Sequence, residues 1–435
     1  IFFITSGMNP KLACLCIALT LFTACKPAED VESTHTAFTG ATIVDGRGGD
    51  PIRDGVLVIS NGRITSVGSR SNVTIPAGAK IVDVSGKYIM PGIINAHGHV
   101  GNAKGIEGGH YSKDNVIDNL SIYARYGITT VVSLGDDRQE AVPLRHVNDS
   151  LPVNRARLFI AGDVISGATP EDAMKVIDQN HQMGVDFMKI RVDDNLGTGQ
   201  KMTEDVYRAV IKRSHELGYR IATHMYYLED ARKLLDAGTD LVAHSVRDVA
   251  VDQSFIDLIK AKGVGYCPTL TREVSTYVYG DTPTFFTDPF FLKEYDTATI
   301  KPLTDPARQS QVRNNRNAQI YRQQLPTAMA NLKTLSDAGV PIVFGTDSGV
   351  PTRFMGYFEH LEMEMMADAG LSPMQIIVSA TRNAADYMEL KDLGTLASGK
   401  WADFLVLDAN PLDNIRNVRT ISAVYIAGMP VSGKS

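Results

Sequence analysis

Residues 93–100 carry the first chemical signal in the chain, because an apolar run ends there in two histidines one residue apart, His97 and His99. Side chains at positions i and i+2 of an extended chain point to the same face, so both imidazoles project together. Neutral imidazole is a common ligand of zinc and similar metals. Two hydrogen-bonded histidines at a strand end would give the same pattern, so a metal site requires further ligands.

Four further candidate ligands lie within or at the ends of later apolar segments, and they are Lys189, His224, His244 and Asp347. His244 could equally be a hydrogen-bonded core histidine. Asp347 precedes a serine and a glycine, and it could equally cap a helix. Lys189 is harder to explain in this way, since apolar residues flank it and a buried lysine is costly unless its charge is paired or removed.

Eight apolar segments of strand-like length alternate with helical segments from residue 91 onward, which is typical of parallel βα units. They are residues 93–99, 127–133, 157–162, 185–192, 219–224, 241–244, 263–268 and 341–347. Eight such units predict a (β/α)8 TIM barrel over residues 91–390. Barrel active sites lie at the C-terminal ends of the strands, so we expect the six candidate ligands to converge at one mouth.

The helical segments carry recognisable start and stop signals. Thr169 followed by Pro170 predicts a helix start, and Gly184 predicts the end of the same helix. Ser372 with Gln375 three residues later predicts a capping box after the eighth segment. These signals support the division of the chain into βα units.

The two ends of the chain are rich in short strand patterns. Residues 37–90 contain several, including a pair separated by the hairpin turn Asn61-Gly62, and residues 391–435 continue in the same style. We therefore predict an α/β protein in which a TIM barrel carries a small β-sandwich built from both chain ends.

Residues 271–340 form a connection between the seventh and eighth segments that is far longer than usual. Its first part is rich in Tyr, Phe and Pro, and residues 305–338 have a helical pattern. Because it leaves the barrel at the catalytic face, we interpret it as a lid with an aromatic wall for an apolar part of the substrate. The same aromatic residues would also serve a contact in a homo-oligomer.

Residues 1–36 predict an export signal and a tether. Met8 is the first methionine, and the apolar run at 12–22 fits the core of a signal peptide. The following Leu-Phe-Thr-Ala-Cys resembles a bacterial lipobox with Cys25 as the lipidated residue, although Phe22 is unusual there, and plain secretion is the alternative. We expect an exported protein, periplasmic or anchored in the outer membrane through Cys25. Only Cys267 then remains in the folded part, so no disulfide framework forms.

The 435 residues include 44% hydrophobic and 21% charged residues, with a net charge of -6. This composition is typical of a soluble globular protein and gives no indication of a nucleic-acid partner. The partner we expect is a small-molecule substrate.

The chain resembles the amidohydrolase superfamily, and within it the imidazolonepropionase-like and Xaa-Pro dipeptidase-like group. The matching motifs are residues 91–99, Lys189, His224, His244, residues 345–349 and the closing segment 394–412. The resemblance implies two divalent metal ions, which we expect to be zinc, and carboxylation of Lys189 by CO2. His97, His99 and Asp347 would bind one ion, His224 and His244 the other, and the carboxylated lysine and a hydroxide would bridge them.

The same resemblance implies that Asp347 is the general acid and base in the hydrolysis of an amide C–N bond, most simply in a dipeptide or N-acyl amino acid. The alternatives are an esterase, lactonase or carbamate hydrolase with the same site, a deaminase with one metal ion, or an inactive binding protein. A one-metal site needs no bridge, so Lys189 argues against the deaminase.

The substrate side differs from many relatives, which carry a small, Gly-rich stretch after the lysine, whereas this chain has charged residues at 191–195. Arg191 follows Lys189 by two residues and is our candidate for binding a substrate carboxylate, with a structural ion pair to a nearby aspartate as an equal alternative. Tyr226 could reach the substrate carbonyl or simply pack. His110 could contact substrate or remain a solvated loop histidine.

Overall fold

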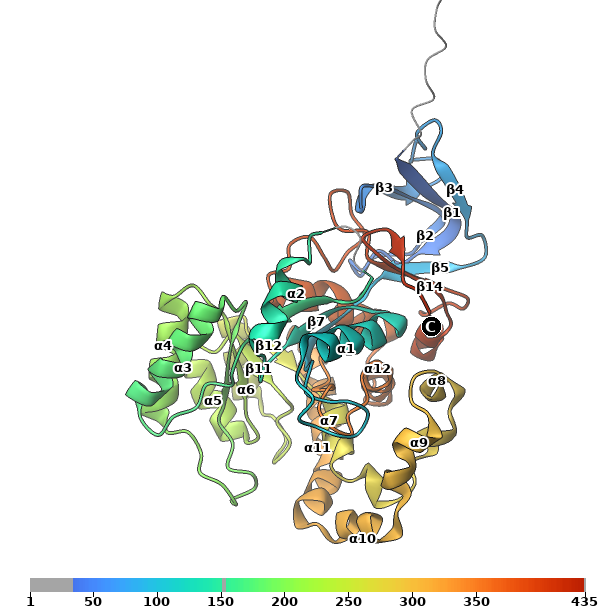
Figure 1. Ribbon diagram of the computed structural model, residues 1–435. Helices are drawn as coiled ribbons and strands as arrows, with labels where there is room; N and C mark the ends of the chain where they lie inside the picture. Colours follow the sequence, from blue (N-terminus) through green and yellow to red (C-terminus); the bar gives the residue numbers. More distant parts are fainter. Residues whose placement is uncertain (1–33, 151–153, 434–435) are drawn as a thin grey trace, which may run out of the picture.

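The computed structural model describes residues 34–150 and 154–433, and the predicted signal segment and Cys25 lie outside the described residues. Both ends of the described chain form a β unit at one end of the molecule, and α/β units fill the middle (Figure 1). A lobe of short helices from the predicted insertion lies on the far side of the α/β part from the β unit (Figure 1).

The β unit is one hydrogen-bonded sheet of eight strands. The N-terminal strands are β1 (His35–Ile43), β2 (Ile52–Ser60), β3 (Arg63–Ser69), β4 (Lys80–Asp83) and β5 (Tyr88–Pro91). The C-terminal strands are β13 (Phe404–Leu407), β14 (Ile421–Ile426) and β15 (Met429–Pro430). The sheet order is β15-β14-β13-β5-β1-β2-β3, with β4 beside β1, so the pairing of β13 with β5 joins the two chain ends.

The core of this sheet is aromatic and aliphatic. The rings of Phe38 and Phe404 lie 5.0 Å apart, and Tyr425 stacks on Phe404 at 4.6 Å. The predicted arrangement of two stacked sheets, a sandwich, stays a prediction because all eight strands belong to one sheet.

The α/β part contains two parallel sheets. The first is β6 (Ile93–Gly98), β7 (Ile128–Ser133) and β8 (Arg157–Ile160), in that order. The second is β12 (Gly265–Cys267), β11 (Leu241–Ala243), β10 (Ile221–His224) and β9 (Met188–Arg191), in that order. All pairs within these sheets are parallel, as βα units require.

Isolated parallel bridges join the two sheets into a TIM-barrel-like ring. Ile165 pairs with Ile190 of β9, Tyr266 of β12 pairs with Ile342, and Gly98 of β6 pairs with Ser348. The eighth strand predicted over 341–347 is not formed as a regular strand, although the segment hydrogen-bonds to both neighbours: the Val343 amide donates to the Tyr266 carbonyl, and the Thr346 amide donates to the His97 carbonyl. A left-handed φ of +59° at Asp347 ends the extended conformation at this point.

The helices of the α/β part cover the outside of the ring (Figure 1). They are α1 (Lys113–Arg125), α2 (Val142–His146), α3 (Pro170–Met183), α4 (Glu204–Glu216), α5 (Leu228–Ala237), α6 (Gln253–Lys262), α12 (Tyr357–Asp368), α13 (Pro373–Val378) and α14 (Ala384–Tyr387). The predicted start and end of α3 are confirmed, since the Thr169 side chain accepts from the Asp172 amide and Gly184 has a φ of +73°. The predicted capping box of Ser372 and Gln375 is also present.

The insertion consists of short helices followed by one long helix. Its helices are α7 (Leu270–Ser275), α8 (Pro289–Leu292), α9 (Thr297–Ile300), α10 (Pro306–Asn314) and α11 (Arg316–Asp337). The remaining short turns of the chain are η1 (Gln139–Ala141), η2 (Val278–Gly280), η3 (Thr284–Thr287), η4 (Lys301–Thr304), the π-helical η5 (Ser379–Asn383) and η6 (Ile415–Arg419). The helical pattern predicted over 305–338 is therefore present, divided at Asn315.

The aromatic residues of the insertion form a core of their own. Phe285, Phe286 and Phe291 are buried. Phe291 lies edge-on to Phe354 at 4.9 Å, and Phe285 lies 5.3 Å from Tyr357, in the segment that leads into α12 and at its start. These rings pack the lobe against α12 and the segment before it, and the lid with an aromatic wall stays a prediction.

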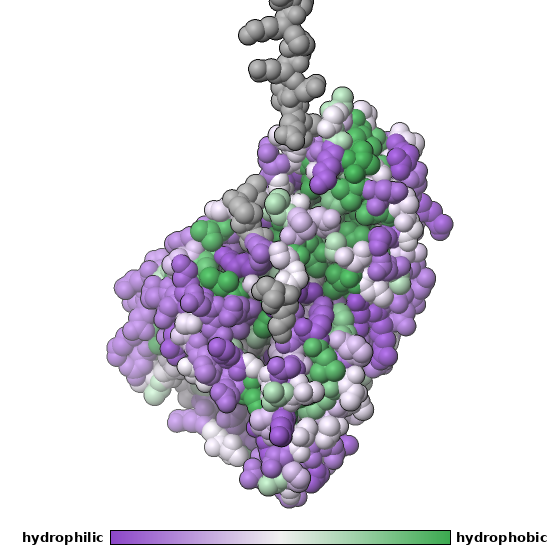
Figure 2. Space-filling view, turned by 45° about the vertical axis from the view of Figure 1, so that its right-hand side comes forward, coloured by the Kyte–Doolittle hydropathy of each residue, from purple (hydrophilic) through white to green (hydrophobic). Residues whose placement is uncertain are grey.

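On the face drawn in Figure 2, the surface is mostly hydrophilic over the α/β part, and the larger hydrophobic areas lie toward the eight-stranded sheet. Among the described residues, no helix has both the length and the apolar character needed to cross a bilayer.

Candidate metal centre

His97, His99 and Asp347 form the centre of the site. Strand β6 carries His97, and His99 follows its last residue, so both imidazoles project from the C-terminal end of that strand. The Nε2 atom of His99 lies 2.8 Å from Oδ1 of Asp347, and Nε2 of His97 lies 3.5 Å from the same oxygen. One nitrogen or oxygen atom from each residue lies within 4.8 Å of the other two, which is compact enough to hold one metal ion.

Lys189 of β9 lies directly beside this group. Its residue surface is 3% exposed, and its Nζ lies 3.2 Å from Nε2 of His97. No carboxylate of the described residues forms an ion pair with it. Burial lowers the pKa of Lys189 to about 8, so the neutral amine is accessible near neutral pH.

His224 and His244 complete the cluster from the ends of β10 and β11. Their ring centroids lie 4.3 Å apart, and His244 lies 4.7 Å from His97. His224 donates from Nε2 to Oδ2 of Asp193 at 2.9 Å, and Nδ1 of His244 pairs with the Thr269 hydroxyl at 2.7 Å. Each ring therefore has one nitrogen fixed by a neighbour and one left for another partner.

The donor set fits divalent metal ions. Burial lowers the pKa of His224 to about 3 and the pKa of His97 and His244 well below the usual range, so these three imidazoles are neutral, as ligands must be. The buried Nδ1 of His97 has no hydrogen-bond partner among the described residues. The structure thus brings all six predicted ligands together at one end of the ring of strands.

The backbone is strained at three residues of the site. His244, Thr269 and Asp347 have φ values of +89°, +47° and +59°, a region that residues with a side chain seldom occupy. Such a conformation costs roughly 1–3 kcal/mol per residue and persists only where the surroundings enforce it. At these three residues the surrounding structure therefore holds the backbone in place.

Glu359 of α12 holds two segments of the site together, and the sequence interpretation missed it. Its carboxylate is fully buried and accepts hydrogen bonds from Asn95 Nδ2 and Thr346 Oγ1, both at 2.6 Å, and from the Ser348 hydroxyl. It therefore ties β6 to the segment that carries Asp347. The only sequence signal is that acidic residues interrupt an otherwise apolar helix.

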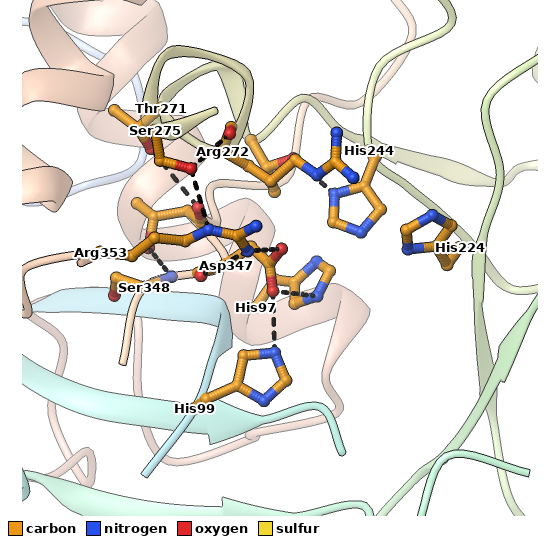
Figure 3. Close-up of polar contacts among 12 residues, drawn as sticks. His97, His99, His224, His244, Thr271, Arg272, Ser275, Asp347, Ser348 and Arg353 are labelled. Carbon is orange, nitrogen blue, oxygen red and sulfur yellow. Dashed lines mark hydrogen bonds and ion pairs between the residues drawn. The ribbon is translucent and has the colours of Figure 1, made fainter. Parts of the chain in front are cut away.

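Arg353 was also missed. Its Nη1 donates to Oδ2 of Asp347, and its Nε donates to the Ser275 hydroxyl at 3.0 Å. Arg353 and His99 approach the Asp347 carboxylate from different sides (Figure 3). Burial alone would raise the pKa of Asp347, but Arg353 and His99 hold it well below its ordinary value.

Arg191 and Tyr226 lie near the cluster without a hydrogen bond to any of its six residues. Arg191 is the last residue of β9, and its side chain is 44% exposed. Its Nη2 lies 3.4 Å from Oδ2 of Asp193. It also lines a pocket of about 510 Å³ together with residues 164–168 and 199–203. Tyr226 is buried, and the Cζ atom of the Arg247 guanidinium lies 4.5 Å from the centre of its ring. The Tyr226 hydroxyl donates to Gln324 of α11.

His110 lies in the loop before α1, exposed and 3.7 Å from a carboxylate oxygen of Glu107. It has no contact with the six clustered residues among those described. The structure therefore does not bring this predicted site residue to the metal centre.

Comparison with known proteins supplies the context for this geometry. A match to the amidohydrolase family covers residues 88–431. The chain is similar to a curated 5-methylthioadenosine/S-adenosylhomocysteine deaminase from Bacillus cereus, with 22% identity over 92% of this chain and 93% of the relative.

Two solved structures are also similar. One is a prolidase-like protein from Bifidobacterium longum, with a TM-score of 0.73 and 26% identity over 92% of this chain and 96% of that one. The other is a Xaa-Pro dipeptidase with bound methionine, with a TM-score of 0.72 and 20% identity over 92% of this chain and all of that one (100%). The likeness extends over the ring of strands and the flanking β unit together.

Proposed function

The chain belongs to the amidohydrolase family and is a metal-dependent hydrolase, and we propose that it cleaves an amide C–N bond of a dipeptide or N-acyl amino acid with two divalent metal ions. The observation that carries this proposal is the buried Lys189, whose Nζ lies 3.2 Å from His97 among the clustered histidines. A buried lysine without an anionic partner is costly as a cation, so its charge has to be removed.

Carboxylation of Lys189 would achieve this. Its Nζ forms a bond to the carbon of CO2 and loses a proton, which gives a carbamate with two oxygen donors. His97, His99 and Asp347 would hold one ion, His224 and His244 the other, and the carbamate would serve both. Nitrogen and oxygen donors of this kind suit zinc, which we propose as the metal. When bound, the ions would supply an activated water and polarise the substrate carbonyl.

Asp347 then transfers the proton. Asp347 is ionised because Arg353 and His99 both stabilise its charge, so it can accept a proton from the attacking water. Its carboxylate can pass the proton to the leaving amine. Expulsion of a neutral amine completes the cleavage.

The pocket beside Arg191 is our proposed site for the acidic end of the substrate. It adjoins Asp193, which contacts His224, so it opens next to the cluster. An arginine at such a position can bind a carboxylate through two parallel hydrogen bonds. The likeness to a prolidase-like protein and a Xaa-Pro dipeptidase supports a substrate with a free carboxylate.

A hydrolytic deaminase is the second candidate, since curated relatives with 22% identity have that activity. It would need only one metal ion, and Lys189 would then have no partner. An esterase, lactonase or carbamate hydrolase would use the two-metal site unchanged.

One experiment distinguishes these candidates. The purified protein is analysed for metal content and tested on dipeptides, N-acyl amino acids, esters, lactones and aminopurine nucleosides. We expect nearly two metal ions per chain and release of an amine from substrates with a free carboxylate. Ammonia release from nucleosides by protein with one ion would replace the proposal with a deaminase, and turnover of esters alone would replace its substrate class.

The proposed location outside the cytoplasm, with a lipid on Cys25, requires a separate test. Cells that produce the protein are labelled with palmitate, and the label should be lost in Cys25→Ser. Equal labelling of both proteins, or of neither, would contradict the lipid anchor.

A further inference from the structure

Asp193 and His224 form a buried pair, and Asp193 is not one of the six proposed metal ligands. The Asp193 side chain is fully buried, and its Oδ2 lies 2.9 Å from Nε2 of His224. We propose that Asp193 is a positioning residue that holds His224 in the tautomer whose Nδ1 is free to bind a metal ion. This inference rests on the proposed function for the metal ion, although the tautomer itself can be measured without one.

The strand register explains why these two side chains meet. His224 pairs with Arg191 in the ladder between β9 and β10, and the Val192 amide donates to the His224 carbonyl at 2.8 Å. Asp193 is the next residue, so it leaves the ladder directly beside the His224 ring. No rearrangement of the chain is needed to form the contact.

The loop after β9 gives two adjacent aspartates different hydrogen-bond partners. The Asn195 amide donates to Oδ1 of Asp193 at 2.9 Å, which leaves Oδ2 for His224. Asp194 instead accepts from the Gly197 amide at 3.0 Å and from the Tyr227 hydroxyl at 3.1 Å. Both carboxylates stabilise the same loop, but only Asp193 contacts a metal-ligand candidate, which makes Asp194 a matched control.

The chemistry follows from the two nitrogens of a neutral imidazole. One carries the proton and the other a lone pair, and only the lone pair can bind a metal. A carboxylate accepts hydrogen bonds and donates none, so Asp193 requires the proton on Nε2 and leaves the lone pair on Nδ1. His244 is held at the opposite nitrogen, Nδ1, by Thr269. The neighbouring rings would therefore present different nitrogens to the centre.

Without Asp193 the His224 ring would populate both tautomers and could rotate. Loss of a partner that orients a metal-bound histidine typically weakens metal binding about 10- to 100-fold. The loss should fall on the ion held by His224 and leave the ion held by His97 and His99 in place.

The first test uses metal-free protein labelled with ¹⁵N in histidine. Two-bond ¹H–¹⁵N correlations identify the protonated nitrogen of each ring, and His224→Gln assigns the signal. We expect His224 to carry its proton on Nε2 in the wild type and in Asp194→Ala. Asp193→Ala should show a mixture or the other tautomer. A wild-type His224 with its proton on Nδ1 would overturn the inference, whether or not any variant folds.

The second test measures zinc binding by dialysis against a competing chelator. We expect the second zinc ion to bind about 10- to 100-fold more weakly in Asp193→Ala than in wild type and Asp194→Ala. Unchanged affinity in Asp193→Ala would overturn the positioning role. A wild type that binds fewer than two zinc ions would contradict the proposed function instead, and the tautomer result would distinguish that failure from failure of this inference.

Discussion

The amine of Lys189 lies 3.2 Å from Nε2 of His97, and no carboxylate among the described residues forms an ion pair with that amine. A lysine cation and a metal-binding imidazole would compete in this arrangement. The contact therefore favours a lysine whose charge has been removed, as carboxylation would do.

Replacement of Lys189 by alanine tests this directly. We expect Lys189→Ala to bind at most one metal ion per chain and to lose nearly all activity, because the shared anionic ligand is missing. Metal content is measured by atomic emission after gel filtration. The control is Lys175→Ala, which removes an exposed lysine paired with Asp172 and should keep both ions. Full metal content and activity in Lys189→Ala would exclude the carbamate.

Arg191→Ala tests the substrate pocket. We expect KM for substrates with a free carboxylate to rise about 10-fold, because a charge-assisted hydrogen bond is lost, while neutral esters are unaffected. Steady-state kinetics on a matched acid and ester pair measures this. The control is Arg208→Ala, which removes only an exposed pair with Glu204. An equal loss for both substrates would assign Arg191 a structural role through its contact with Asp193.

The sequence predicted that the six side chains would lie close together because they stand within or at the ends of apolar segments, and parallel strands bring such ends together. Their role as metal ligands stays a prediction. The sequence predicted the starts of α3 and α13 because caps depend on residues only three positions apart. The eighth segment is irregular and ends in a left-handed turn at Asp347, which the apolar pattern does not indicate. A local apolar pattern predicts that a residue is buried, but it does not predict which other residues it contacts.

For the same reason, the sequence did not predict the residues that contact the candidate ligands from outside the set of six. Glu359 and Asp193 act through contacts with residues that lie far away in the chain or in a neighbouring strand. Arg353 contacts Asp347 six residues earlier through an irregular segment, and no spacing rule marks such a contact. The aromatic residues of the insertion were correctly recognised as an apolar group. Their packing against α12 and the segment before it could not be read from their composition.

Glu359→Ala tests whether the support under the site matters for folding. Three donors that now bond the carboxylate would lose their buried partner, so we expect the free energy of unfolding to fall by about 3–5 kcal/mol. Urea unfolding is measured with excess chelator, so that metal binding does not contribute. Glu216→Ala, at the exposed end of α4, should change stability by less than about 0.5 kcal/mol. A similarly small effect of Glu359→Ala would show that β6 and the Asp347 segment do not depend on this carboxylate.

His360 provides a test of pH dependence away from the metal centre. It is buried in α12, its Nε2 pairs with the Tyr126 carbonyl at 2.8 Å, and burial lowers its pKa to about 3. In the unfolded chain its pKa is about 6.5. Between these values the unfolded state binds a proton that the folded state does not, so stability is lost as the pH falls below about 6.5, by up to about 1.4 kcal/mol per pH unit.

His360→Gln should flatten this dependence, because glutamine can still donate to the Tyr126 carbonyl but does not titrate. We expect the metal-free variant to lose less unfolding free energy than wild type between pH 6 and pH 4.5, by about 1.4 kcal/mol for each pH unit. Because His97, His224 and His244 are buried as well, some slope should remain in His360→Gln. A slope identical to wild type would mean that His360 takes up a proton in the folded state and is not held neutral by its burial.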